Sequence, residues 1–180
     1  MRVGSELRKL LRSVAKLVWI FLFASSLVQT CLAAPSAGQS LLNKPAPEIA
    51  RADLSGTHVT LKSLRGKVVL LNFWATWCAP CQIEMPVFNQ WQQQYGPRGF
   101  QVIGISMDDD AVPVRKLLTK LKTQYPNAMG DAQLGERYGG VMGLPLSFLI
   151  DRSGVVRARF QGETDLKTIE KELKTMLDRH

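Results

Sequence analysis

The chain has 180 residues, of which 46% are hydrophobic and 21% are charged, a balance typical of a folded globular protein. Its formal net charge is +8, but half of this excess lies in residues 1–33, and the charges of the remainder are mixed in sign. This distribution argues against nucleic-acid binding. Three cysteines, Cys31, Cys78 and Cys81, are too few for a scaffold held together by disulfides.

Residues 1–33 have the three regions of a secretory signal. A basic stretch precedes an apolar run at 17–28, and small residues follow up to Ala33. Cleavage after Ala33 is one expectation. Retention as a membrane anchor is the other, because the stretch 17–34 comes close to the ~20 apolar residues that a membrane-spanning helix needs.

A lipid modification of Cys31 is a third interpretation of this leader. Thr30 disfavours it, because lipoprotein signals carry a smaller residue at that position. All three outcomes place residues 35–180 outside the cytoplasm, in the periplasm or its equivalent, since the positive residues stay inside. Disulfides persist in such compartments. We expect a linker at 34–40 and a single folded domain at 41–180.

The pattern of this domain alternates between strands and helices. Apolar runs predict strands at 58–61, 67–75, 100–107, 146–150 and 155–160. Amphipathic stretches predict helices at 80–95, 111–121, 133–138 and 165–177. We expect the first helix to break or kink at Pro86, and the acids 108–110 to cap the second. This order of elements predicts an α/β fold with a mixed central sheet flanked by helices.

Cys78 and Cys81, in the stretch FWATWCAPC, stand where a predicted strand meets a predicted helix. A structural zinc site is disfavoured, because it needs four ligands and the two histidines, His58 and His180, have no ligand spacing. An inert disulfide that closes so short a loop stabilises little. Reversible dithiol chemistry is the favoured interpretation, with no other cofactor and no metal.

The predicted place of Cys78 at the start of a helix puts its sulfur beside backbone N–H groups that lack partners, and these stabilise a thiolate. A thiol with a pKa of about 8.5 is only about 3% ionised near neutral pH, whereas one with a pKa of about 7 is half ionised. Cys78 is therefore predicted to be the exposed attacking sulfur. Cys81, one turn further in, is predicted to be the shielded sulfur that resolves the mixed disulfide. Trp77, next to Cys78, is a candidate for substrate contact, with a place in the core as the alternative.

FWATWCAPC resembles the active site of the thioredoxin superfamily, and the wider pattern resembles its extracytoplasmic TlpA/ResA-like branch. The similarity extends from about 42 to 177 and includes KPAPEI, VVLLNFWATWC, VIGISMDD and GLPLSFLIDRSG. It implies a thioredoxin-like fold with an N-terminal β-hairpin extension. It also implies a thiol-disulfide oxidoreductase that acts on the disulfides of client proteins.

The resemblance implies roles for single residues as well. Pro145 matches the family's cis-proline beside the cysteine pair, and a plain turn proline is the alternative. Leu144, just before it, would offer its backbone to the substrate chain as an added strand. Asn72 stands where thioredoxin proper has a buried Asp. Glu84, on the helical face of Cys81, is the candidate for proton transfer at Cys81, and an exposed helix glutamate is the alternative.

The dipeptide Ala79-Pro80 between the cysteines resembles the arrangement in thioredoxin, and no histidine stands there to stabilise the thiolate further. We therefore expect a reductant, recharged by a membrane electron-transfer thiol reductase, with apocytochrome c among the family's clients. A general oxidant, a peroxiredoxin-like peroxidase and a copper-handling metallochaperone are the alternatives. Ala75, where a peroxidase needs Thr, weighs against the second, and the cysteine spacing without a positioned histidine weighs against the third.

Overall fold

The computed structural model describes residues 41–179. The predicted leader, Cys31 within it and the predicted linker at 34–40 lie outside the described residues. Within residues 41–179, no helix combines the length and the hydrophobicity needed to cross a bilayer.

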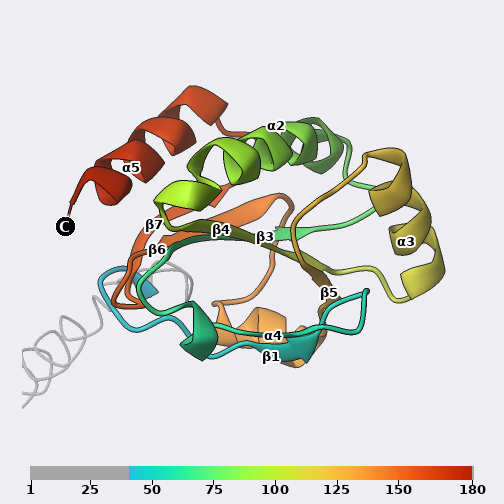
Figure 1. Ribbon diagram of the computed structural model, residues 1–180. Coiled ribbons are helices and arrows are strands. Elements are labelled where there is room, and N and C mark those ends of the chain that lie inside the picture. The colour runs from blue at the N-terminus through green and yellow to red at the C-terminus, as the bar shows by residue number, and fades with distance from the viewer. Residues whose placement is uncertain (1–40, 180) are drawn as a thin grey trace, which may run out of the picture. The chain divides into compact units, whose positions relative to one another are not determined.

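A five-stranded mixed sheet forms the centre of the domain, with the strand order β5-β4-β3-β6-β7 (Figure 1). The central strand β3 (Val68–Trp74) is parallel to β4 (Phe100–Ser106) and antiparallel to β6 (Leu146–Ile150). At one edge β5 (Asn127–Met129) pairs in parallel with β4, and at the other β7 (Val156–Gln161) pairs antiparallel with β6. The mixed central sheet is thus confirmed.

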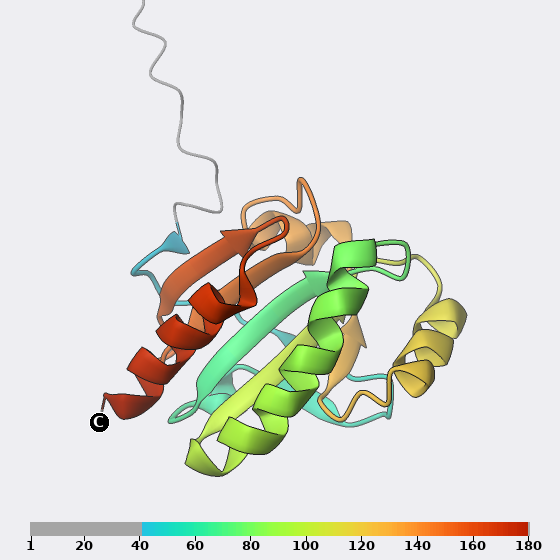
Figure 2. The ribbon, with the colours of Figure 1, turned by 90° about the horizontal axis from the view of Figure 1, so that it is seen from above.

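Two long helices cover one face of the sheet (Figures 1 and 2). α2 (Ala79–Tyr95) and α5 (Leu166–Asp178) pack on alternate residues of β3, such as Val68 and Leu70, which are fully buried. Helix side chains complete this half of the core, among them Phe88, Trp91, Ile169 and Leu173. The carboxyl end of β3 leads directly to the amino end of α2, and this junction contains the cysteine pair.

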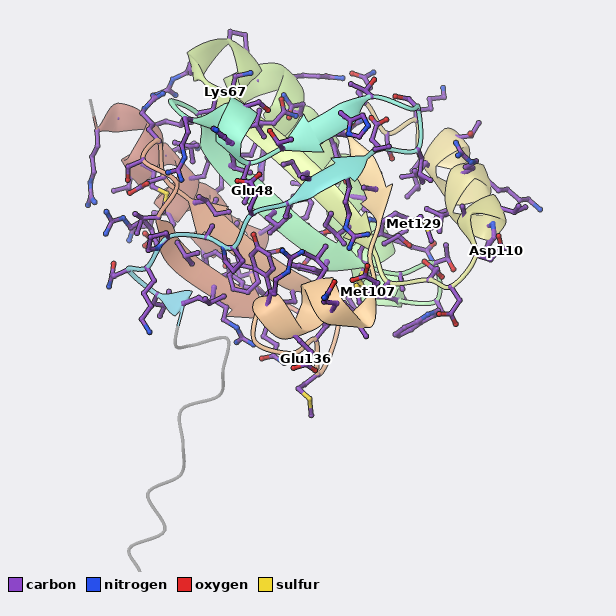
Figure 3. The ribbon with its side chains drawn as sticks, turned by 90° about the horizontal axis from the view of Figure 1, so that it is seen from below. Glu48, Lys67, Met107, Asp110, Met129 and Glu136 are labelled. Carbon is purple, nitrogen blue, oxygen red and sulfur yellow. A yellow bond between two sulfur atoms is a disulfide. The ribbon has the colours of Figure 1, made fainter. Side chains whose placement is uncertain are left out.

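The opposite face is covered by a β-hairpin and a short helix, as Figure 3 shows from below. The hairpin pairs β1 (Ala50–Ala52) with β2 (His58–Thr60), and the helix is α4 (Ala132–Arg137). The other residues of β3 point to this side, so both faces of the strand are buried, as its unbroken apolar run predicts. The β-hairpin extension is present. α3 (Ala111–Lys120) lies beside the β5 edge of the sheet (Figures 1 and 2).

One prediction about the elements is wrong, and three short elements were not predicted. α2 runs without a break through Pro86, although this residue has no N–H to donate to the preceding turn. The expected break is therefore absent, and Met85 and Phe88 on either side of Pro86 are buried in the core. The short strand β5 and the 3₁₀ turns Lys62–Leu64 and Gly96–Arg98 were not predicted, because three residues are too few to show a periodic pattern.

Candidate functional site

Cys78 and Cys81 form a disulfide at the amino end of α2, with their Cα atoms 5.3 Å apart. Cys78 is the N-cap of the helix, and its sulfur accepts a hydrogen bond of 3.3 Å from the backbone N–H of Cys81. Pro80 fits the first turn, where a missing N–H costs no helical hydrogen bond. The same backbone donor and the positive end of the helix dipole would stabilise a thiolate at Cys78 after reduction.

Cys81 is buried as predicted, whereas Cys78 is more buried than expected. Cys78 is 4% exposed and Cys81 is 0% exposed, so the predicted difference is small in the oxidised protein. The description of Cys78 as an exposed sulfur was therefore wrong for this state. Its burial follows from an apolar cluster in which both cysteines pack with Trp74, Met85 and other side chains, including that of Leu144.

Trp77 and Leu144 were predicted to meet the substrate, and Pro145 was predicted as the cis-proline beside the pair. Trp77, directly before Cys78, is 72% exposed, which rules out its alternative place in the core. The Leu144–Pro145 peptide bond is cis, and Leu144 packs against the cluster that contains both cysteines. Met142, in the same loop, is 89% exposed. At the rim of the site, Trp77 therefore presents an apolar side chain to solvent next to the disulfide.

Asp108 fixes the turn that leads into the cysteine pair. Its carboxylate accepts hydrogen bonds from the backbone N–H of Thr76 at 2.9 Å and from the hydroxyl of Ser106 at 2.8 Å, and a further one from the hydroxyl of Thr76. The sequence predicted only a helix cap for this acidic triplet, and that role belongs to Asp110. Nothing in the run of three acids indicated that Asp108 would hold this turn while Asp110 capped the helix. We call the contacts of Asp108 with Thr76 and Ser106 the clamp.

Trp74 is held by a buried hydrogen bond that the sequence did not indicate. Its indole N–H donates to the side-chain oxygen of Asn127 on β5 at 3.0 Å. Gly104 on β4 makes room for this contact, because a Cβ there would lie 1.9 Å from the same oxygen. Trp74 is fully buried and packs in the cluster of the cysteines, so this contact supports one wall of the site.

Glu84 is a buried carboxyl three residues after Cys81, and therefore on the same side of α2. It is 5% exposed, which excludes the alternative of an exposed helix glutamate. Burial raises its pKa to about 7, and the negative charge of Glu163 adds to the effect. Within the described residues its Oε2 atom has no hydrogen-bond partner. A carboxyl with this pKa exchanges protons near neutral pH.

Asn72 occupies the middle of β3, below α2. Its side-chain amide donates to the hydroxyl of Ser147 at 3.0 Å, and its Oδ1 atom has no partner among the described residues. Asn72 cannot take up or release a proton. Glu84 on the helix provides a carboxyl that can do so on this side of the sheet.

The described part of the chain contains no cluster of side chains that could bind a metal ion. No group of three or more His, Cys, Asp or Glu side chains within residues 41–179 is placed to hold a metal ion. What the geometry offers is a dithiol that closes to a disulfide, a helix start that favours the thiolate, and a carboxyl titrating near neutrality. These features suit thiol-disulfide exchange.

Comparisons with known proteins agree with this chemistry. The Redoxin family model matches residues 41–177. The thiol-disulfide oxidoreductase ResA of Bacillus anthracis is 37% identical over 133 residues, which cover 74% of this chain and 77% of that protein. The thiol:disulfide interchange protein DsbE of Escherichia coli is 32% identical over 146 residues, covering 78% of this chain and 76% of that protein.

A solved structure supports the same assignment. The thiol:disulfide interchange protein of the thioredoxin family from Chlorobium tepidum is 32% identical and superposes with a TM-score of 0.69, covering 74% of this chain and 95% of that one. The chain therefore belongs to the Redoxin family, as a TlpA/ResA-like thiol-disulfide oxidoreductase of the thioredoxin superfamily.

Proposed function

We propose that this protein is an extracytoplasmic reductant of protein disulfides, with apocytochrome c among its candidate clients. The carrying observation is the Cys78–Cys81 pair at the start of α2, where the Cys81 N–H already donates to the Cys78 sulfur. The leader at 1–33 supports the location, either as a cleaved signal or as a retained anchor. No cofactor beyond the cysteine pair is part of the proposal.

The reaction begins with the reduced pair. The Cys78 thiolate attacks one sulfur of a client disulfide, a mixed disulfide forms, and the other client sulfur leaves as a thiolate. Cys81 then loses its proton to the Glu84 carboxylate and attacks the Cys78 sulfur. The second client sulfur leaves and takes up a proton. Two electrons have passed to the client, and the pair is left as the disulfide seen in the structure.

The rim of the site provides the means to hold a client chain. The backbone of Leu144 can pair with an extended client segment, while Trp77 and Met142 give it an apolar surface. After each cycle the Cys78–Cys81 disulfide must be reduced again by an electron donor. The proposed donor is a membrane thiol reductase that transfers electrons across the bilayer. Ala79-Pro80 between the sulfurs, without a histidine, favours the reducing direction.

The direction is tested by the reduction potential. Equilibrating the protein with glutathione and with dithiol buffers, then trapping free thiols by alkylation, gives the potential of the pair. We expect a value well below about −180 mV, and a value well above it would reverse the direction. Reduction of insulin by the wild type and by a Cys78→Ser, Cys81→Ser double variant tests the activity, and equal rates would contradict it.

A further inference from the structure

The end of the domain opposite the disulfide carries a concentration of positive charge, here called the basic pole. Because β3 runs toward the cysteines, the segments before β3 and β4 lie at the other end, with the turn after β6 and the end of α5 (Figures 1 and 2). The seven cations of the pole are Lys44, Arg65, Lys67, Arg98, Arg152, Arg157 and Arg179. Its three carboxylates are Asp151, Glu172 and Asp178.

Some of these cations hold the fold together. Arg98 forms an ion pair of 2.6 Å with Asp178, and Arg157 forms one of 2.6 Å with Asp151. Arg152 donates to the backbone oxygen of Gly66 at 2.8 Å. The other four are exposed, and within residues 41–179 none of them forms an ion pair: Lys44, Arg65, Lys67 and Arg179.

Cations are missing from the segments that form the cysteine site, although exposed cations also occur outside the pole, on α3, α4 and α5. Neither Lys nor Arg occurs between Lys67 and Arg98, a stretch that includes all of β3 and α2 and both cysteines. Next to the site, Asp109 and Asp110 are exposed acids. Figure 3 shows Lys67 and Asp110 far apart on the molecule. An anionic surface would therefore attract the pole and turn the disulfide away.

The described chain begins at this same pole. Asn43 donates its backbone N–H to the oxygen of Val156 at 2.8 Å, and Leu42 beside it is an exposed apolar side chain. The segment 34–40 joins the pole to the leader with its apolar run at 17–28, and seven extended residues reach at most about 25 Å. An open groove of about 540 Å³ at the pole is lined by three of its arginines, Arg152, Arg157 and Arg179, and by two of its carboxylates, Asp151 and Glu172.

We propose that the basic pole docks on an anionic phospholipid surface, with the Cys78–Cys81 disulfide facing away from it. The attraction between the exposed cations and lipid phosphates acts within a Debye length, about 8 Å at physiological salt, so the pole has to lie close to the headgroups. Which leaflet it meets rests on the proposed extracytoplasmic location. The docking itself depends on neither the direction of electron flow nor the identity of the client.

In the test, the isotope-labelled full chain is mixed with lipid nanodiscs in which a small fraction of headgroups carries a gadolinium chelate, and it is studied by NMR. Paramagnetic relaxation of backbone amides is compared between phosphatidylglycerol and phosphatidylcholine discs. With phosphatidylglycerol we expect at least about fivefold faster relaxation at Gly66 and Gly154 of the pole than at Ala75 and Gly143 near the site. Adding salt to 1 M, where the Debye length is about 3 Å, should abolish this contrast.

A matched pair of variants separates the pole from overall charge. K44Q, R65Q, K67Q and R179Q together should reduce the contrast to the phosphatidylcholine level. Removing four exposed cations elsewhere, with K116Q, K120Q, R137Q and K167Q, should leave it unchanged. Insulin reduction, measured apart from the lipid experiment, checks that both sets of variants are folded and active, since neither set touches the cysteine site.

Three outcomes would overturn the inference. The first is equal relaxation at both ends of the domain in phosphatidylglycerol. The second is loss of the contrast in both sets of variants, which would mean that total charge and not the pole is responsible. The third is a set of concentration-dependent shifts at the pole without any lipid effect, which would assign this surface to contact between copies of the chain.

Discussion

Asn72 on β3 and Ser147 on β6 are direct cross-strand neighbours, and a hydrogen bond of 3.0 Å joins their side chains in the interior. Both residues are nearly fully buried below α2. Because Asn72 is neutral at every pH, the central strand brings no charge under the cysteine pair. Proton exchange on this side then falls to the carboxyl of Glu84 on the helix.

Asn72→Asp would place a second carboxyl in this interior. Burial should raise its pKa, so the folded chain would hold the proton while the unfolded chain ionises. We expect the variant to lose stability as pH rises, with a larger deficit relative to wild type at pH 8 than at pH 5. Urea unfolding at the two pH values measures this difference. An equal deficit at both would mean that shape and not charge sets the cost.

Glu84 itself should make stability depend on pH. Burial raises its pKa from 4.5 to about 7, so below pH 4.5 both folded and unfolded chains are protonated and stability is unaffected. As pH rises from there to about 7, the unfolded chain ionises first, and the free energy of unfolding falls by about 3 kcal/mol.

Glu84→Gln should remove this slope, as measured by urea unfolding between pH 4 and pH 8. Glu136→Gln, at an exposed glutamate on α4, is the matched control and should keep it. If the wild type shows no slope to remove, Glu84 does not have the raised pKa.

The proposed proton transfer predicts a kinetic effect of the same Glu84→Gln change. Without the carboxylate, Cys81 should resolve the mixed disulfide roughly 10²-fold more slowly, while attack by Cys78 is little changed. Quenched-flow alkylation of a reaction with a model disulfide should therefore show the mixed disulfide accumulating. Equal slowing of both steps would point to a general structural effect.

The two cysteines should differ in what they capture. Cys81→Ser leaves the attacking sulfur in place and removes the resolving one, so client chains should stay bound to Cys78 through a disulfide. Cys78→Ser should hold few or none, because Cys78 is the sulfur at the helix start, where a thiolate is stabilised, and Cys81 has no exposed surface. Non-reducing gel electrophoresis with reduced and oxidised client compares the variants, and stronger capture by Cys81 would reverse the assigned roles.

The clamp formed by Asp108 should matter for both stability and rate. Asp108→Ala removes the acceptor for Thr76 and Ser106, and leaving their donors without a partner should cost about 1–3 kcal/mol of unfolding free energy. Insulin reduction should slow as the turn before Cys78 loosens. Asp109→Ala, at the exposed neighbouring acid, should change neither quantity by much. Equal effects of the two changes on stability and rate would contradict the role of Asp108 in holding the turn before Cys78.

Much of this fold could be predicted from local pattern. The apolar run of β3 and Pro80, two residues after Cys78, are short local patterns. They predicted the strand, the start of the helix and the cysteine pair at the junction between them. The spacing of Glu84 from Cys81 gave the correct side of the helix. It did not decide between burial and exposure, because that depends on the sheet and α5 packing around α2.

The unpredicted features of the site all depend on contacts between distant residues. Trp74 meets Asn127 across 53 positions of the sequence, and Thr76 meets Asp108 across 32. Asn127 belongs to a strand of three residues, and Asp108 belongs to a run of acids that looks like a helix cap. No local period marks such partners, so only the folded chain identifies them.

The absence of Lys and Arg from β3 and α2 has a practical consequence for the bench. Trypsin cuts after these two residue types, so digestion releases residues 68–98 as one peptide that carries both cysteines. Oxidised and reduced protein then yield the same fragment, differing only by the mass of two hydrogens or of the blocking groups added to each thiol. Mass spectrometry of a crude cell extract could thus read the redox state of the enzyme at work.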